Sequence, residues 1–176
     1  MKILLIACIA FSTACFSQVA VGKSSVTNSN VSLEFGNSEN RGLILPWVTS
    51  ENDIINPVDG TVIFDTSDTK VKYLAAGAWI GLNADPNLVT PVTIDTSLQD
   101  TKTENTNAMV RIGTNVDPDV DGILVLSDTN KAMVLPKVAS PHLNVVNPAP
   151  GMIVYDTTSR LVAVFTGDAW SFWGPR

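Results

Sequence analysis

The chain has 176 residues, of which 45% are hydrophobic, and its 11 basic and 17 acidic side chains give a formal net charge of −6. This negative balance, without any cluster of Lys and Arg, argues against nucleic acid and anionic lipid as partners. Both cysteines, Cys8 and Cys15, lie near the N-terminus. A disulfide framework or a cysteine metal cluster is therefore excluded for the rest of the chain.

Residues 1–17 are predicted to form a secretory signal. A positive start precedes a short apolar run at 3–11, and small and polar residues follow up to Ser17. That layout is typical of a cleaved signal, and the run is shorter than the roughly 20 apolar residues that span a bilayer. We therefore expect export to the periplasm, cell surface or medium, without a transmembrane helix. The alternative is a lipid anchor on Cys15, although Ser12 stands where lipoprotein signals usually carry Leu.

Most of the remaining chain is predicted to be an internal repeat, with two tandem copies of one module. Pro46 aligns with Pro136 and Trp79 with Trp170, at offsets of 90 and 91 residues. The longest matching blocks are residues 43–50 with 133–140, 60–66 with 151–157, and 19–22 with 110–113. We predict a first copy at 18–82, a connector at 83–109 and a second copy at 110–176.

Short strands and turns are the predicted structure within each copy. Residues 50–53 read as a capped helical turn, and Ser140-Pro141 offers the equivalent start. Apolar and β-branched runs at 152–155, 161–165 and 169–173 are separated by turn residues, including Gly167-Asp168. The predicted fold class is all-β, with two tandem modules of short-strand β-meanders.

The connector at 83–109 differs in composition from both copies. It is rich in Asp, Asn and Thr and contains no aromatic residue, which is typical of a loosely held linker. Val92 and Ile94 alternate with polar residues after Pro91. The alternation leaves open an edge strand within the connector.

Aromatic residues that recur in both copies are expected to pack in the core, because each copy must fill the same space. They are Trp79 with Trp170, and Phe64 with Tyr155. Trp47 and Trp173 do not recur, since Lys137 and Leu82 take their places. Exposed aromatic faces can stack on sugars, so Trp47 and Trp173 are the candidate residues for a glycan-binding module.

An acidic run at the start of the second copy is the candidate metal site. Asp117, Asp119 and Asp121 alternate before Gly122, and Asp128 stands where a calcium loop would close. The closing residue is Asp rather than the usual bidentate Glu, and the following residues read as a strand. These departures favour a solvated acidic turn, with Ca²⁺ binding as the alternative and no other cofactor expected.

No constellation in the sequence points to catalysis. His142 is the only histidine and follows Ser140-Pro141 in a turn, without a nucleophile elbow of the G-x-S-x-G type. The glutamates lie in polar or turn-like contexts that single out no pair for glycoside cleavage; they are Glu34, Glu39, Glu51 and Glu104. We expect a protein that is not an enzyme, with a hydrolase as the remaining alternative.

The order of five sequence blocks in the second copy is distinctive. The blocks are residues 112–115, 123–127, 135–138 and 151–157, closed by Trp170. This order resembles a tandem repeat of secreted and cell-surface proteins of the Bacteroidota, and its blocks are similar to phage tail-fibre-like modules. The chain departs from that pattern at Ala132, where the family usually has Gly, and at Asp65 and Asp156, where Asn is common.

The resemblance implies a non-catalytic, β-rich and oligomeric stalk or adhesin-like part. By this analogy we expect a homo-oligomer, with a homotrimer as the assembly, on the cell surface or in the medium. Other surface proteins or glycans are further partners that such a part would meet. The resemblance names no ligand.

Overall fold

The computed structural model describes residues 18–37, 39–82, 92–103, 105, 108–114, 120 and 122–174. Strands dominate these residues, and each helical segment is a single turn, so the all-β prediction is confirmed. The predicted signal, both cysteines and part of the connector lie outside the described residues. None of the helices in the described part has the length and apolar character needed to span a bilayer.

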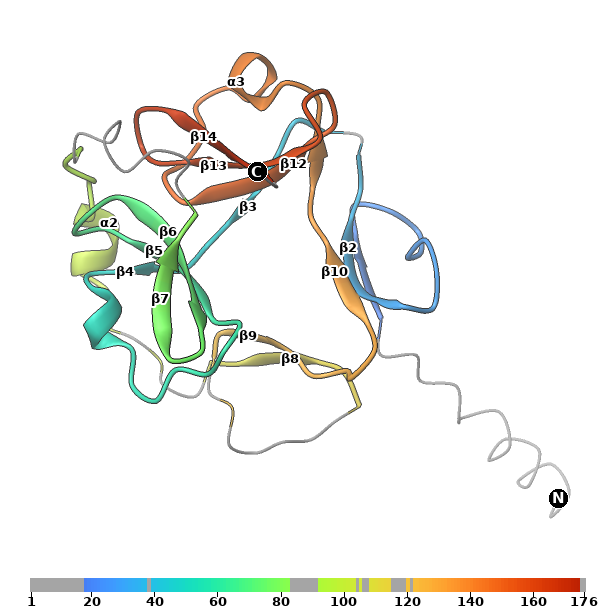
Figure 1. The fold of residues 1–176 in the computed structure, drawn as a ribbon, viewed down its shortest axis with the longest axis horizontal. Helices are drawn as coiled ribbons and strands as arrows, with labels where there is room; N and C mark the ends of the chain where they lie inside the picture. The colour runs from blue at the N-terminus through green and yellow to red at the C-terminus, as the bar shows by residue number, and fades with distance from the viewer. Residues whose placement is uncertain are drawn as a thin grey trace, which may run out of the picture.

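The strands fall into an N-terminal segment, residues 18–82, and a C-terminal segment, residues 108–174 (Figure 1). The first contains β1 (Val19–Val21), β2 (Val31–Phe35), β3 (Leu43–Ile44), β4 (Trp47–Val48), β5 (Val62–Asp65), β6 (Lys70–Ala75) and β7 (Ala78–Gly81). The second contains β8 (Val110–Ile112), β9 (Leu124–Leu126), β10 (Ala132–Val134), β11 (Lys137–Val138), β12 (Met152–Asp156), β13 (Leu161–Phe165) and β14 (Trp170–Trp173).

Each segment contains one four-strand meander with the same pairing. Strand β4 runs parallel to β5, and β5, β6 and β7 are antiparallel. Strands β11 to β14 repeat this arrangement, which confirms the predicted meander. The registers also correspond, because Trp47 lies opposite Phe64 and Lys137 lies opposite Tyr155.

The last turn of each meander contains a glycine with positive φ. Ala76 and Gly77 join β6 to β7 with φ of 51° and 74°, as a type I′ hairpin requires. Between β13 and β14, Gly167 has φ of 114°, and the Thr166 N–H donates to Ala169 O at 3.0 Å. The predicted tight turn at Gly167-Asp168 is therefore present.

Three short helical turns complete the described fold. Ser50 caps the turn η1 (Glu51–Asp53) by accepting from the Asn52 N–H, whereas Ser140 has φ of 48° and gives α3 (Pro141–Asn144) no side-chain cap. In the connector, residues 92–96 pair with no described strand, and α2 (Ser97–Asp100) follows them. The Asp95 carboxylate accepts from the Ser97 N–H at 3.0 Å, a local bond that favours a turn over an edge strand.

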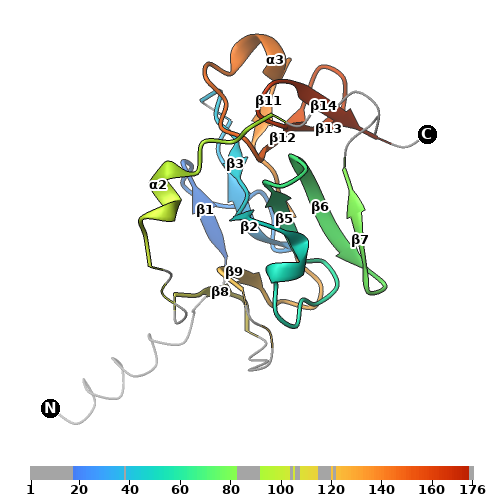
Figure 2. The ribbon, with the colours of Figure 1, turned by 90° about the vertical axis from the view of Figure 1, so that its left-hand side faces the viewer.

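The two meanders share one apolar core. Leu45, Phe64 and Val71 of the N-terminal segment pack with Ile153 and Val164 of the C-terminal segment. The β11–β14 meander lies over one end of the β4–β7 sheet, and β8 with β9 lies at the opposite end of the molecule (Figures 1 and 2). The core therefore ties together residues about 90 positions apart in the sequence.

Candidate assembly interface

Two strand pairings join the segments. Strand β10 runs parallel to β2, with Met133 opposite Leu33, and β3 runs antiparallel to β12, with Leu43 opposite Ile153. Figure 1 shows β10 beside β2 and β3 crossing toward the β11–β14 sheet. In each segment, the strand before the Leu-Pro dipeptide thus pairs with a strand of the other segment.

Residues of the strands that these pairings cover are buried. Val31 and Leu33 of β2 are 5% and 3% exposed beside β10, and Met152 and Ile153 of β12 are 8% and 7% exposed beside β3. Removing apolar area from water stabilises a fold by about 25 cal/mol per Å². The cross-segment strands therefore contribute to the core as well as to the sheets.

Side-chain hydrogen bonds also cross between the segments. The Trp47 Nε1–H donates to Pro150 O at 2.8 Å, and the Ser32 hydroxyl donates to an Asp128 carboxylate oxygen at 3.0 Å. The Trp47 ring lies 6.1 Å from the Phe64 ring, between ring centroids. Trp47 is therefore half-buried, with its polar edge bound by protein.

We expect Trp47→Phe to lower the free energy of unfolding by about 1–3 kcal/mol, because Pro150 O loses its indole donor. Chemical denaturation of the two proteins measures this difference. Trp173 is 45% exposed, so Trp173→Phe is the control and should change stability by less than about 0.5 kcal/mol. Equal effects of the two substitutions would contradict a structural role for the Trp47 hydrogen bond.

An ion cluster centred on the buried Lys72 and Asp65 links η1 to β5 and β6. Lys72 Nζ is 2.8 Å from Asp65 Oδ2, 2.6 Å from Glu51 Oε2 and 2.9 Å from Asp68 Oδ2. Burial alone would raise the pKa of Asp65, but hydrogen bonds from Lys72 and Ser67 outweigh it and hold that pKa below its ordinary value. Burial alone would lower the pKa of Lys72, but hydrogen bonds with Asp65, Asp68 and Glu51 outweigh it and raise that pKa.

The C-terminal segment keeps the carboxylate of this cluster, but no cation among the described residues takes the place of Lys72. Asp156 takes the place of Asp65, and Ala163 lies opposite Val154 as Lys72 lies opposite Ile63. Asp156 accepts instead from three other donors, the Ser140 N–H, the Thr158 N–H and the Ser159 hydroxyl. The aspartate therefore fixes the turn after each strand, and Lys72 belongs to one segment only.

Glu34 is a second buried carboxylate with local partners. It is 3% exposed, lies 2.7 Å from Lys23 Nζ, and accepts from both the N–H and the hydroxyl of Thr27 at 2.6 Å. The bonds from Lys23 and then Thr27 lower the pKa of Glu34 to about 2. The loop between β1 and β2 is thereby fastened to β2.

Acid should weaken this loop, because the pKa of Glu34 is lower in the folded chain than its ordinary value of 4.5. The stabilisation is complete above about pH 4.5 and is lost as the pH falls toward 2. Melting temperatures followed by circular dichroism should fall less steeply over this range in Glu34→Gln than in the parent. Glu39→Gln, at an exposed ion pair, is the control, and an unchanged slope in Glu34→Gln would contradict the prediction.

Of the four carboxylates of the predicted calcium loop, the structure describes Asp128 alone. Asp117, Asp119 and Asp121 lie outside the described residues. Asp128 accepts from the N–H and hydroxyl of Thr114 and pairs with Lys131 at 3.2 Å. The Thr114 N–H is the largest influence that lowers the pKa of Asp128 to about 2. Within the described ranges no group of three or more His, Cys, Asp or Glu residues is placed to hold a metal, and Ca²⁺ binding stays a prediction.

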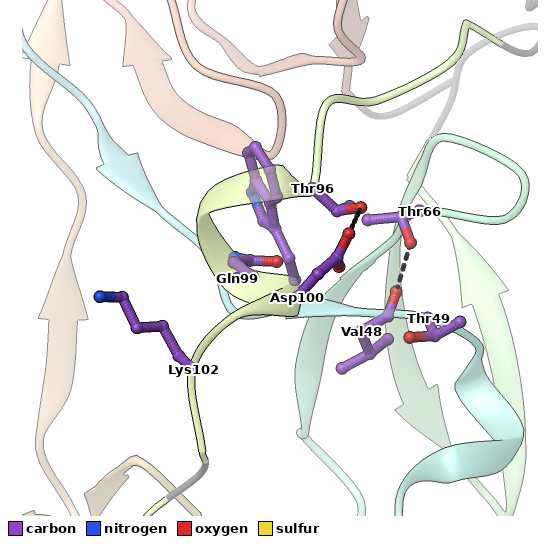
Figure 3. Close-up of a pocket in the computed structure, with 8 residues that line it drawn as sticks. Val48, Thr49, Thr66, Thr96, Gln99, Asp100 and Lys102 are labelled. Atoms are coloured by element: carbon purple, nitrogen blue, oxygen red, sulfur yellow. Dashed lines mark hydrogen bonds between the residues drawn. The ribbon is translucent and has the colours of Figure 1, made fainter.

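The aromatic and histidine candidates occupy separate places. Trp47 lines a cavity of about 360 Å³ with residues of β4, the turn after β5 and α2. Figure 3 shows Thr96 turned toward Asp100, which accepts from its hydroxyl at 3.1 Å, and Lys102 pointing away from them. Trp173 lies on β14, and the exposed His142 makes a T-shaped ring contact with Phe172, with ring centroids 5.7 Å apart. The structure brings none of these candidates together.

Two features that organise this region are not predicted by the sequence analysis. The ion cluster around Lys72 draws its members from η1, β5, the following turn and β6. The cross-segment pairings join strands about 100 residues apart. The one usable signal in the sequence is Lys72 itself, a charged residue between the apolar Val71 and Tyr73.

Comparison with known proteins finds one relationship. Residues 111–174 match a family model described as "Phage tail like trimerisation region". No curated protein and no solved structure matches the chain. The matched residues begin in β8 and end just after β14, so the C-terminal segment, with its meander and its cross-segment strands, is similar to a trimerisation region of phage tail type.

Proposed function

We propose that the chain is a non-catalytic structural protein whose segments are two copies of one β module and which assembles as a homotrimer. The observation that carries the proposal is the match of residues 111–174 to a phage tail-like trimerisation region. The N-terminal segment supports it, since its meander has the same strand order and registers. The function is that of a fibre-like or adhesin-like part.

The carboxylates support a structural role. Each described carboxyl group with a clearly shifted pKa is shifted downward; the groups are Glu34, Asp65, Asp95, Asp128 and Asp156. A general acid of a hydrolase needs a raised pKa to hold its proton near neutral pH. These groups act as ionised acceptors that fasten turns and strands.

Light scattering after size-exclusion chromatography tests the assembly. We expect a mass three times that of the chain at micromolar concentration, unchanged on moderate dilution. A mass equal to one chain under these conditions overturns the proposal. The control for nonspecific association is high salt, which should leave a trimer built on apolar strand edges intact.

We also propose that the protein is exported by the signal at residues 1–17. Mass spectrometry of the secreted protein should show Gln18 as the first residue. A protein that begins at Cys15 with a mass increase for acyl chains would support the lipid-anchored alternative. Retention of the full chain in the cytoplasm overturns export.

A glycan-binding function is the second candidate, because Trp173 is 45% exposed on the last strand. An exposed indole face can stack on a sugar ring. A glycan array should then score positive with the parent and negative with Trp173→Ala. An array without any signal removes this candidate and leaves the structural proposal unaffected.

A further inference from the structure

The edge that β10 covers in one segment is open in the other. Leu33 of β2 lies opposite Val19 of β1, as Leu124 of β9 lies opposite Val110 of β8, so β2 and β9 occupy equivalent places. Strand β2 has β10 on its second edge, whereas β9 pairs with β8 alone among the described strands. Leu33 is accordingly 3% exposed and Leu124 is 41% exposed.

A second strand edge, on β12, is covered in the C-terminal segment, whereas the equivalent edge of β5 in the N-terminal segment is open. The first half of β12 is covered by β3, and Met152 and Ile153 are buried there. Thr61 and Val62 take the equivalent places at the start of β5 and are only half-buried. Within the part of the chain that the structure describes, β4 covers only the second half of β5, opposite Phe64 and Asp65. The N-terminal segment therefore lacks the strand that β3 supplies to β12.

Strands β3 and β10 can each pair with one strand along each of their two edges. The Leu45 N–H, just after β3, donates to Gly151 O before β12, while the Ala132 N–H of β10 donates to Asn30 O before β2. Ala132 is the counterpart of Gly42, three residues before Leu45. In an extended strand, residues an odd number apart direct their N–H groups to opposite edges. Among the described strands, β3 and β10 therefore each pair along one edge, and their other edge carries no pairing.

We propose that a second copy of this chain fills both open edges, by repeating between chains the contact that joins the two segments within one chain. Strand β3 of one chain adds parallel to β9 of its neighbour, with Leu43 opposite Leu124. Strand β10 of the neighbour adds antiparallel to β5, with Val134 opposite Thr61. The inference rests on the proposed assembly and names the surfaces that make it.

The side chains on these edges are suited to pairing with a second copy of the chain. The two strands that would meet on the outer edge are apolar and exposed, with Ile44 of β3 at 52%, and Ile123 and Leu124 at β9 at 60% and 41%. Open strand edges with apolar side chains favour pairing with another chain. The contact is head-to-tail, so it closes into a ring when the rotation per chain divides a full turn. Three chains in such a ring leave no open edge of either kind.

Mixing two single-cysteine variants tests the register. Both are built in the full chain with Cys8→Ser and Cys15→Ser, one with Thr61→Cys and the other with Val134→Cys. We expect a disulfide-linked pair of chains on a non-reducing gel only when the two are mixed and oxidised. The matched control is Ile44→Cys with Met152→Cys in one chain, which occupies the same register within the molecule and should close without linking chains.

The two measurements together distinguish a failure of the edge pairing from a failure of the proposed trimer. A trimer by light scattering with no link in the mixture overturns the inference and leaves the trimer standing. A link in the mixture together with a mass other than three chains supports the edge pairing and overturns the trimer. Linking of either variant alone shows a different contact and also overturns the inference.

A charge on the open edge gives a second, independent measurement. Leu124→Lys should reduce the mass by light scattering from the assembly to a single chain, because a lysine on a strand edge opposes edge pairing. Leu143→Lys, at a residue 74% exposed on α3, is the control and should leave the mass unchanged. Circular dichroism confirms that both variants are folded. An intact assembly in folded Leu124→Lys overturns the inference.

Discussion

Replacing Lys72 by methionine should lower the free energy of unfolding by about 3–5 kcal/mol, the cost of leaving a buried carboxylate without its partner. Asp65 is 1% exposed and Lys72 is 9% exposed, so water cannot take over from the lost ammonium group. Methionine keeps the volume of the aliphatic part of the lysine side chain, but it cannot donate a hydrogen bond to Asp65. Urea denaturation of parent and variant measures the difference.

Two companion variants make this result specific. Lys70→Met removes an outward ion pair, 3.6 Å from Asp68 and about one-third exposed, and should cost less than about 1 kcal/mol. Adding Asp65→Asn to Lys72→Met removes the uncompensated charge and should restore part of the lost stability. A loss below about 1 kcal/mol in Lys72→Met would show that the cluster is not needed for stability.

Gly151→Ala is expected to be the most damaging change at the junction of the two segments. Gly151 has φ of 74°, and an added Cβ would lie 2.7 Å from the Cβ of Phe64. The left-handed backbone costs an alanine about 1–2 kcal/mol, and forcing a methyl group into a packed core adds about 1–3 kcal/mol. The melting temperature should fall accordingly.

Gly60 provides a matched control within the same molecule. It occupies the equivalent place before β5, has φ of 90°, and its added Cβ would meet nothing within 4 Å. Gly60→Ala should therefore show the backbone cost alone. The difference between the two variants measures the packing of Phe64 against the other segment, and equal losses would mean that this packing is loose.

Local chemistry made the meanders predictable from the sequence. Turn residues such as Gly167 and Asp168 stand between apolar runs, and hairpin pairing connects neighbours in the chain, so short-range signals suffice. The helical turn at Ser50 was predictable for the same reason, since its cap lies two residues from the N–H that it binds. The sequence does not decide whether Trp173 is exposed, because its counterpart Leu82 is not aromatic, whereas the structure shows it 45% exposed.

Long-range pairing was not predictable in this way. Nothing local distinguishes β10 from β3, yet β10 pairs with β2 and β3 with β12. The same apolar edge is compatible with several partners, and the choice depends on where the chain brings them together. The helix α2 was missed because the alternation at Val92 and Ile94 predicts an extended segment without showing whether a neighbouring strand exists to pair with it.

Because the two segments share one core, the length of chain between them affects how they assemble. Leu45 and Phe64 pack with Ile153 in a single cluster, so each half binds the other, and the covalent link between the halves is a tether that sets their effective concentration. Short flexible tethers give millimolar values, which fall as the tether lengthens. Tether length therefore decides whether a segment docks on its own chain or exchanges into a neighbour.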